Sequence, residues 1–154
     1  MYKNNEGYPN PTEGMAISNF MREYKQKQRA EWERKNKIMR RPKVYIVSKY
    51  AGDTKENIKR ARKYCRFAVK NNKLPIASHL LYPQFLNDED PTEREIGMLF
   101  GLALLRTCKE VWCFGTDYSE GMKKEIHEAK RLKKRIRYFD YEMEEMLWKR
   151  EKRR

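Results

Sequence analysis

A short polar segment in the last third of the chain holds the residue types best suited to chemistry. In residues 116–125 (TDYSEGMKKE), Ser119 stands at a predicted helix start, and the free first-turn N–H groups at Gly121 and Met122 suit an anion such as a phosphate. Glu125 follows about one turn later. A carboxylate there can face a sugar carbon as a nucleophile, or stabilise an oxocarbenium-like transition state. The alternative is structural: Glu125 pairs with neighbouring lysines and Ser119 only caps the helix.

Two other loops could add polar groups. Residues 49–53 join a predicted strand to a helix and bring the charge of Lys49, but they match neither a G-x-G-x-x-G fingerprint nor a P-loop. Residues 78–85 offer His79 and Tyr82 to stack on or bond a base. The structural alternatives are an ordinary turn at 49–53 and a satisfied core histidine at 79.

The elements that must position these loops alternate between strand and helix. Apolar β-branched and aromatic runs predict strands, and helical spacing of apolar residues predicts helices. The predicted strands cover 43–48, 74–77, 110–114 and 136–139, and the predicted helices between them cover 53–70, 92–107 and 120–132. This order predicts an α/β fold with a parallel sheet, right-handed crossovers and helices on both faces. Ligands then bind at the carboxyl ends of the strands, where segments 48–53, 78–85 and 115–125 converge.

The helix predicted over 92–107 is apolar on most sides, so we expect it to be buried on both faces or to lie at a subunit contact. Gly97 and Gly101 lie one turn apart in it and would permit close packing.

The two ends of the chain read differently from its middle. Residues 1–14 read as extended or disordered chain, and 15–41 as a charged helix that is polar all round beyond Tyr24 and ends before Pro42. Residues 141–154 read as a charged helical tail. The predicted organisation is a basic extension over 1–42, an α/β domain over 43–140 and the tail.

The composition limits the class of protein and its partners. The 36 Lys and Arg against 22 Asp and Glu give a net charge of +14, which favours anionic partners such as nucleotides, nucleic acid or acidic protein faces. Three cysteines without a C-x-x-C pair predict reduced, buried thiols in a cytoplasmic protein. His79 and His127 are isolated, so we expect no metal site. The sequence contains no apolar run long enough to cross a membrane and no signal-peptide pattern, so we expect no membrane association.

Four segments of the chain carry a resemblance to a known family. They are YIVSKY (45–50), SHLLYP (78–83), CKEVWCFG (108–115) and SEGMKKE (119–125). Over residues 43–140 the chain resembles the nucleoside 2-deoxyribosyltransferase superfamily, which includes relatives that hydrolyse the N-glycosidic bond of deoxynucleoside monophosphates. It is most similar to an uncharacterised branch common in bacteria, phages and prophages.

The resemblance implies a flavodoxin/Rossmann-like sheet of about four to five strands, without a cofactor, in a homodimer or larger homo-oligomer whose pocket a neighbouring subunit helps to complete. The family's Gly-x-x-x-Glu fits Gly121 and Glu125, making Glu125 the implied catalytic carboxylate, and Asp117 fits the conserved aspartate ahead of it. Ser48 and Lys49 stand where Gly and Pro are common, and the lysine would suit a phosphate. The implied substrate contacts are Ser48, Lys49, Tyr50, His79, Tyr82, Gly115, Ser119, Gly121 and Met122.

Three functions remain open at this point. The first is an enzyme that cleaves or transfers at the N-glycosidic bond of a (deoxy)nucleoside monophosphate. The second is a protein that binds a nucleotide or a nucleotide signal without turnover. The third is a nucleic-acid or protein adaptor in which basic residues of segment 15–41 follow a phosphate backbone, although Glu23, Glu31 and Glu33 interleave with them.

Overall fold

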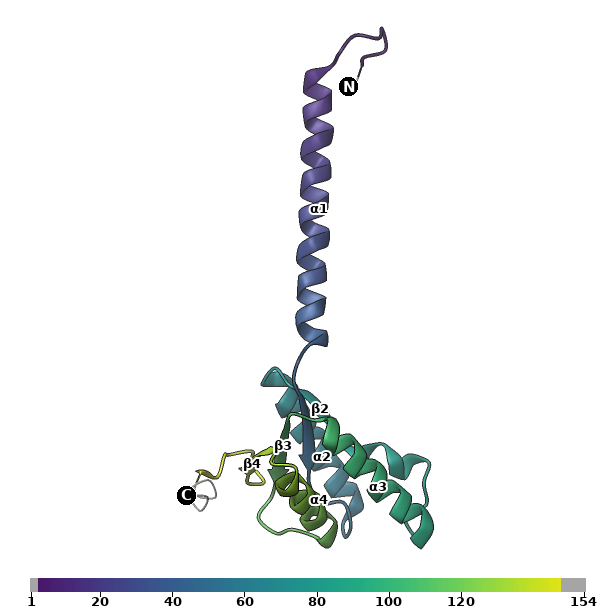
Figure 1. The fold of residues 1–154 in the computed structure, drawn as a ribbon, viewed down its shortest axis with the longest axis vertical. Helices are drawn as coiled ribbons and strands as arrows, with labels where there is room; N and C mark the ends of the chain where they lie inside the picture. The colour runs from purple at the N-terminus through teal and green to yellow at the C-terminus, as the bar shows by residue number, and fades with distance from the viewer. Residues whose placement is uncertain (1–2, 148–154) are drawn as a thin grey trace. The chain divides into compact units, whose positions relative to one another are not determined.

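The structure, a computed structural model, describes residues 3–147, and the chain divides into two units, Met1–Arg40 and Arg41–Arg154 (Figure 1). The first unit contains one helix, α1 (Pro11–Met39). The second contains the strands β1 (Lys43–Val47), β2 (Leu74–Ile76), β3 (Glu110–Phe114) and β4 (Arg135–Phe139), the helices α2 (Thr54–Lys70), α3 (Pro91–Thr107) and α4 (Glu120–Arg131), and the 3₁₀ turns η1 (Ser78–Leu80) and η2 (Tyr82–Gln84).

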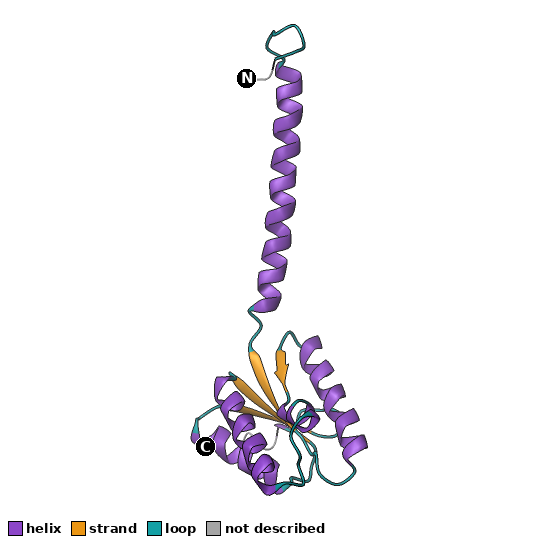
Figure 2. Cartoon of the chain, turned by 90° about the vertical axis from the view of Figure 1, so that its right-hand side faces the viewer, coloured by secondary structure: helices purple, strands orange, loops and turns teal. Residues whose placement is uncertain are grey.

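The four strands form one parallel sheet in the order β2-β1-β3-β4. Tyr45 of β1 pairs with Ile76 on one side and Val111 on the other, and Val111 pairs with Ile136 of β4. Helices cover both faces of the sheet (Figure 2). The predicted α/β fold with a parallel sheet is therefore confirmed. The chain turns to opposite sides of β1 to form β2 and β3, so the switch point of the topology lies between β1 and β3.

The alternation of side chains along each strand builds a separate core on each face. On one face, buried residues of β1, β3 and β4 pack with Leu105 of α3 and with Met122 and Ile126 of α4. On the other face, buried Trp112, Phe114 and Phe139 belong to a cluster that includes Tyr64 of α2. The rings of Tyr64 and Phe114 stack with centroids 4.2 Å apart. Cys108 and Cys113 are buried and Cys65 is half-buried, and these three cysteines are thiols and not disulfides.

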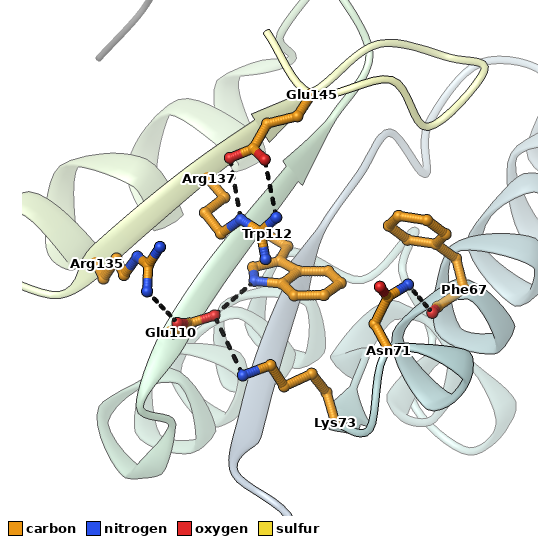
Figure 3. Close-up of polar contacts among 8 residues, drawn as sticks. All are labelled: Phe67, Asn71, Lys73, Glu110, Trp112, Arg135, Arg137 and Glu145. Atoms are coloured by element: carbon orange, nitrogen blue, oxygen red, sulfur yellow. Dashed lines mark hydrogen bonds and ion pairs between the residues drawn. The ribbon is translucent and has the colours of Figure 1, made fainter. Parts of the chain in front are cut away.

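A polar network surrounds Trp112 of β3 and reaches β4, the end strand of the sheet (Figure 3). The buried carboxylate of Glu110 accepts from Trp112 Nε1 at 2.9 Å and from Arg135 at 3.2 Å. Arg137 donates two hydrogen bonds to Glu145, at 3.0 and 2.8 Å, while its guanidinium lies 4.8 Å from the Trp112 ring centroid. These contacts let charged side chains cover the aromatic face of the end strand.

The helix starts follow the capping rules. Asp53 accepts from Glu56 N–H at 3.3 Å, Asp90 from Thr92 N–H at 2.8 Å, and Ser119 from Met122 N–H at 3.3 Å. Ser119 therefore caps α4, which is one of the two roles that the sequence left open for it. Of the two alternatives predicted for α3, this chain alone does not show burial on both faces, because Leu99 is 55% and Phe100 45% exposed.

α1 begins four residues earlier than predicted. Asn10 caps it by accepting from Glu13 N–H at 3.1 Å, and Pro11 occupies the first turn, where its missing N–H costs nothing. The prediction of extended or disordered chain through residue 14 is therefore wrong from Pro11 onward. None of the residues of α1 is buried, and ion pairs Arg29–Glu33 and Lys35–Glu31 lie along it.

None of the helices within residues 3–147 combines the length and apolar character that a membrane crossing requires.

The helical tail predicted after β4 is wrong for its described part. Asp140 Oδ1 accepts from the N–H groups of Glu142 and Glu144, both at 2.9 Å, which draws the backbone away from a helix. Met143 has a φ of 65°, and Glu145 forms an isolated antiparallel bridge with Phe139. Residues 148–154 of that prediction lie outside the described residues.

Candidate functional site

A cavity of about 810 Å³ opens at the carboxyl ends of the strands. Its walls come from the loop after β1, from η1 and η2, from the N-terminal half of α3 and from the start of α4. Of the residues predicted for the site, the cavity is lined by Ser48, Tyr50, His79, Tyr82, Ser119, Gly121, Met122 and Glu125. The three loops expected to converge contribute to one site. α3 contributes a wall that the sequence had not suggested, including Glu93, Arg94, Glu95, Met98 and Leu99.

A chain of hydrogen bonds ends at the carboxylate of Glu125. Tyr45 Oη donates to Glu125 Oε1 at 2.7 Å and lies 2.7 Å from Ser78 Oγ. Because an ionised carboxylate can only accept, the single proton of Tyr45 points to Glu125, and Ser78 donates to the Tyr45 oxygen. The chain thus joins β1, η1 and α4 and fixes the orientation of one Glu125 oxygen.

Gly101 of α3 lies against this chain of hydrogen bonds. A Cβ at position 101 would meet Tyr45 Oη at 2.9 Å and Ser78 Oγ at 3.0 Å. Gly97, one turn earlier, would place its Cβ 3.5 Å from Leu86 Cδ1, which is ordinary contact. The expectation of close packing therefore holds at Gly101, where it brings α3 against the two hydroxyls.

The electrostatics of the site keep Tyr45 protonated and make Glu125 titrate near neutral pH. Burial raises the pKa of Glu125 to about 7, and the hydrogen bond from Tyr45 acts in the opposite direction. Burial, together with the charge of Glu125, raises the pKa of Tyr45 well above its ordinary value. Tyr45 therefore remains a donor at any pH at which Glu125 changes charge.

His79 sits beside Ser48 as a neutral ring. Its Nε2 lies 2.9 Å from Ser48 Oγ, and burial lowers the pKa of His79 to about 4. The Tyr50 ring is tilted against it, with centroids 6.4 Å apart. At neutral pH this wall of the cavity therefore presents aromatic surface and uncharged polar atoms.

Lys49, Asp117 and Gly115 lie beside the cavity and are not among the residues that line it. Lys49 Nζ donates to Asp117 Oδ2 at 2.5 Å, with both side chains exposed. This hydrogen bond lowers the pKa of Asp117. Gly115 has a φ of 101°, and a Cβ there would meet the Tyr141 ring at 3.0 Å. The positive φ and the nearby Tyr141 ring thus explain why the turn after β3 has a glycine at position 115.

The start of α4 offers two N–H groups to the cavity region. Met122 N–H donates to Ser119 Oγ at 3.3 Å, so in this arrangement that N–H is already engaged by the helix cap. The N–H groups of Glu120 and Gly121 precede the first intrahelical bond and have no acceptor within residues 3–147. An anion at the helix start would therefore meet Glu120 and Gly121 first.

Sequence reasoning missed Tyr45 and Ser78 as polar members of the site. Tyr45 reads as one more apolar residue of a buried strand, although a buried tyrosine hydroxyl almost always has a partner, and that was the available signal. Asn57 was also missed. Its Nδ2 donates to the carbonyls of Tyr50 and Ala51, at 3.1 Å each, and so fixes the loop after β1. Within the described residues, no three His, Cys, Asp or Glu side chains cluster as metal ligands would.

Comparisons with known proteins agree with the fold. The model of a family described as a domain of unknown function, DUF7768, matches residues 42–139. A solved structure from a study of 2-deoxyribosyltransferase of the psychrotolerant bacterium Bacillus psychrosaccharolyticus superposes with a TM-score of 0.50. It is 14% identical in sequence, and the match covers 64% of this chain and 72% of the other. A search of curated proteins returns no significant match.

Proposed function

We propose that this chain, which belongs to the family of the domain of unknown function DUF7768, acts at the N-glycosidic bond of a nucleotide, with Glu125 as the carboxylate that meets the sugar C1′. The observation that carries the proposal is the half-buried Glu125 carboxyl, held at 2.7 Å by Tyr45 in a cavity at the strand ends. The fold supports it, because the similar solved structure comes from a study of a 2-deoxyribosyltransferase.

The reaction needs two steps at one carbon. An ionised Glu125 oxygen attacks C1′, the C1′–N bond breaks with its electron pair going to the base, and the base takes up a proton from water as it leaves. The resulting ester between Glu125 and the sugar is then cleaved by water, which releases the sugar phosphate, or by a second base, which completes a transfer. Tyr45 holds one carboxylate oxygen in place, so the other is left to react.

The groups beside Glu125 suit a monophosphate. The N–H groups of Glu120 and Gly121 lie at the start of the helix that carries Glu125, and the helix dipole favours a negative charge there. Lys49 adds a nearby positive charge. Asp117 carries a lowered pKa and an ion pair with Lys49, so it fits a role in orienting the sugar better than one in donating a proton.

The exposed part of α3 supports a homodimer as the working form. Leu99 both lines the cavity and is 55% exposed, and Phe100 beside it is 45% exposed. A second copy packed on this surface would cover the apolar side chains and close the open side of the cavity. Light scattering at micromolar concentration, with Phe100→Glu as the disrupting variant, tests this part of the proposal.

The deciding experiment measures base release from a panel of nucleoside and deoxynucleoside monophosphates by chromatography. Wild-type protein is compared with Glu125→Gln and with Glu144→Gln, an exposed glutamate after β4 that lies outside the cavity lining. We expect release by wild type and Glu144→Gln, and a loss of more than about 1,000-fold in Glu125→Gln. Tight nucleotide binding by calorimetry without release from any substrate would replace the enzyme with a nucleotide-binding protein.

A further inference from the structure

The outer surface of α2 carries a continuous stripe of positive charge. Six lysines and arginines of α2 follow one another at intervals of one, three or four residues. We call them the α2 stripe: Lys55, Lys59, Arg62, Lys63, Arg66 and Lys70. At 100° per residue they fall within an arc of about 100°, and at 1.5 Å per residue they extend over about 22 Å. All six residues are exposed.

The sheet fixes the direction in which the stripe points. The buried residues of α2 are Asn57, Ala61, Tyr64 and Ala68, and they occupy the opposite side of the helix. Tyr64 and Ala68 belong to the core that α2 shares with the sheet. The stripe therefore faces away from the domain, and none of its residues lines the cavity.

No acidic side chain neutralises the stripe within residues 3–147. The one acid of α2, Glu56, pairs with Arg60, which is not a member of the stripe, at 3.5 Å. By contrast, α1 pairs Arg29 with Glu33 and Lys35 with Glu31. Cations at i and i+4 repel each other, and the stripe contains four such pairs, for example Lys55 with Lys59. An arrangement that opposes its own helix is explained by an anionic partner that relieves the repulsion.

We propose that the α2 stripe binds the sugar-phosphate backbone of a nucleic-acid duplex. A duplex carries one negative charge per 1.7 Å of its axis, so about 22 Å of it presents about a dozen charges to the six cations. The stripe holds no aromatic side chain, so it lacks the stacking surface of single-strand binders. Val69, 46% exposed beside the stripe, is one small apolar side chain and too little to anchor a membrane or a protein interface, and the apolar side of α2 packs against the sheet. Backbone contacts carry no sequence information, so the binding is independent of base sequence.

The test measures binding of a fluorescent 30-bp DNA duplex by anisotropy, at salt concentrations from about 25 to 200 mM. The stripe variant carries Lys59→Gln, Arg62→Gln, Lys63→Gln and Arg66→Gln. The matched control carries Lys25→Gln, Lys27→Gln, Arg34→Gln and Lys37→Gln in α1, which removes the same charge from another exposed helix. Glutamine has a helix propensity close to that of lysine and arginine, and circular dichroism verifies that both variants fold.

We expect the logarithm of the wild-type binding constant to fall with the logarithm of salt concentration with a slope of about −5. In the stripe variant the magnitude of this slope should be smaller by about three to four, and the affinity should be at least about tenfold lower. The α1 control should keep most of the salt slope and most of the affinity of wild-type protein. Three results would overturn the proposal: no duplex binding by wild type at 25 mM salt, equal losses in the two variants, or tighter binding to single strands or to anionic vesicles than to the duplex. Base release by the stripe variant should match wild type, so failure here is separate from failure of the proposed activity.

Discussion

The hydroxyl of Tyr45 and the carboxylate of Glu125, 80 residues apart in the chain, lie 2.7 Å from each other at the cavity. One comes from β1, an inner strand of the sheet, and the other from the second turn of α4. Tyr45 cannot lose its proton at neutral pH because burial and the Glu125 charge both raise its pKa. The pair therefore has one proton donor of fixed direction and one acceptor whose charge responds to pH.

Removal of that donor should move the pH dependence of activity. In Tyr45→Phe the ionised form of Glu125 loses its hydrogen bond, so the pKa of Glu125 rises above its value of about 7. If ionised Glu125 is the nucleophile, the acid limb of kcat/KM shifts to higher pH, and activity at pH 7 falls about tenfold. Tyr64→Phe removes a hydroxyl on the other face of the sheet and should leave the limb unchanged. An unmoved limb in Tyr45→Phe would remove Glu125 ionisation from the rate-determining chemistry.

The two glycines of α3 should respond to alanine in opposite directions. Gly101→Ala places a methyl group 2.9 Å from Tyr45 Oη, so the hydroxyl chain must shift, with a loss of about 1–3 kcal/mol in the free energy of unfolding. Gly97→Ala meets only Leu86 at 3.5 Å and gains helix propensity, which should stabilise by about 0.5–1 kcal/mol. Urea titration measures both. Equal effects of the two substitutions would show that the contact of Gly101 with Tyr45 has no energetic weight.

Glu125 should make the folded protein less stable as pH rises. Its folded-state pKa of about 7 lies above the ordinary value of 4.5, so the folded state binds the proton more tightly between those limits. The contribution of the Glu125 proton to the free energy of unfolding is greatest below pH 4.5 and is lost as the pH rises through 7. Glu125→Gln should therefore exceed wild type in unfolding free energy by about 1–3 kcal/mol at pH 8, with the difference shrinking toward pH 4.5. A difference that is independent of pH would mean that the carboxyl is not desolvated.

His79 should act with the opposite sign over nearly the same range of pH. Its folded-state pKa of about 4 lies below the ordinary value of 6.5, because burial disfavours the charged ring. Stability from the neutral ring is full above pH 6.5 and is lost as the pH falls toward 4. The loss of wild-type stability on acidification should be smaller in His79→Gln, measured by urea titration at pH 7, 5.5 and 4.5. His127→Gln, an exposed histidine of α4, serves as the control.

The sequence was sufficient for the order of elements and for the place of the site. The runs at 43–48 and 110–114 are too apolar and too short to be anything but buried strands, and the polar segments after them must meet at one edge of a parallel sheet. The hydroxyl chain was not accessible in the same way. Tyr45 fits the apolar pattern of its strand, and its partners come from elements that only the folded sheet brings near. The two wrong predictions of element bounds come from side-chain hydrogen bonds to the backbone that the sequence analysis overlooked. Asn10 caps α1 earlier than predicted, and Asp140 prevents a helix after β4.

The contact between Gly101 and the two hydroxyls gives α3 a mechanical property. The same rigid helix presents Leu99 and Phe100 at the surface and touches Tyr45 and Ser78 from within, only one or two residues away along its axis. A partner that pressed on the outer side could not displace the helix inward, because no space remains between the glycine and the hydroxyls. Force applied at the surface of α3 would instead be transmitted to the oxygen that orients Glu125.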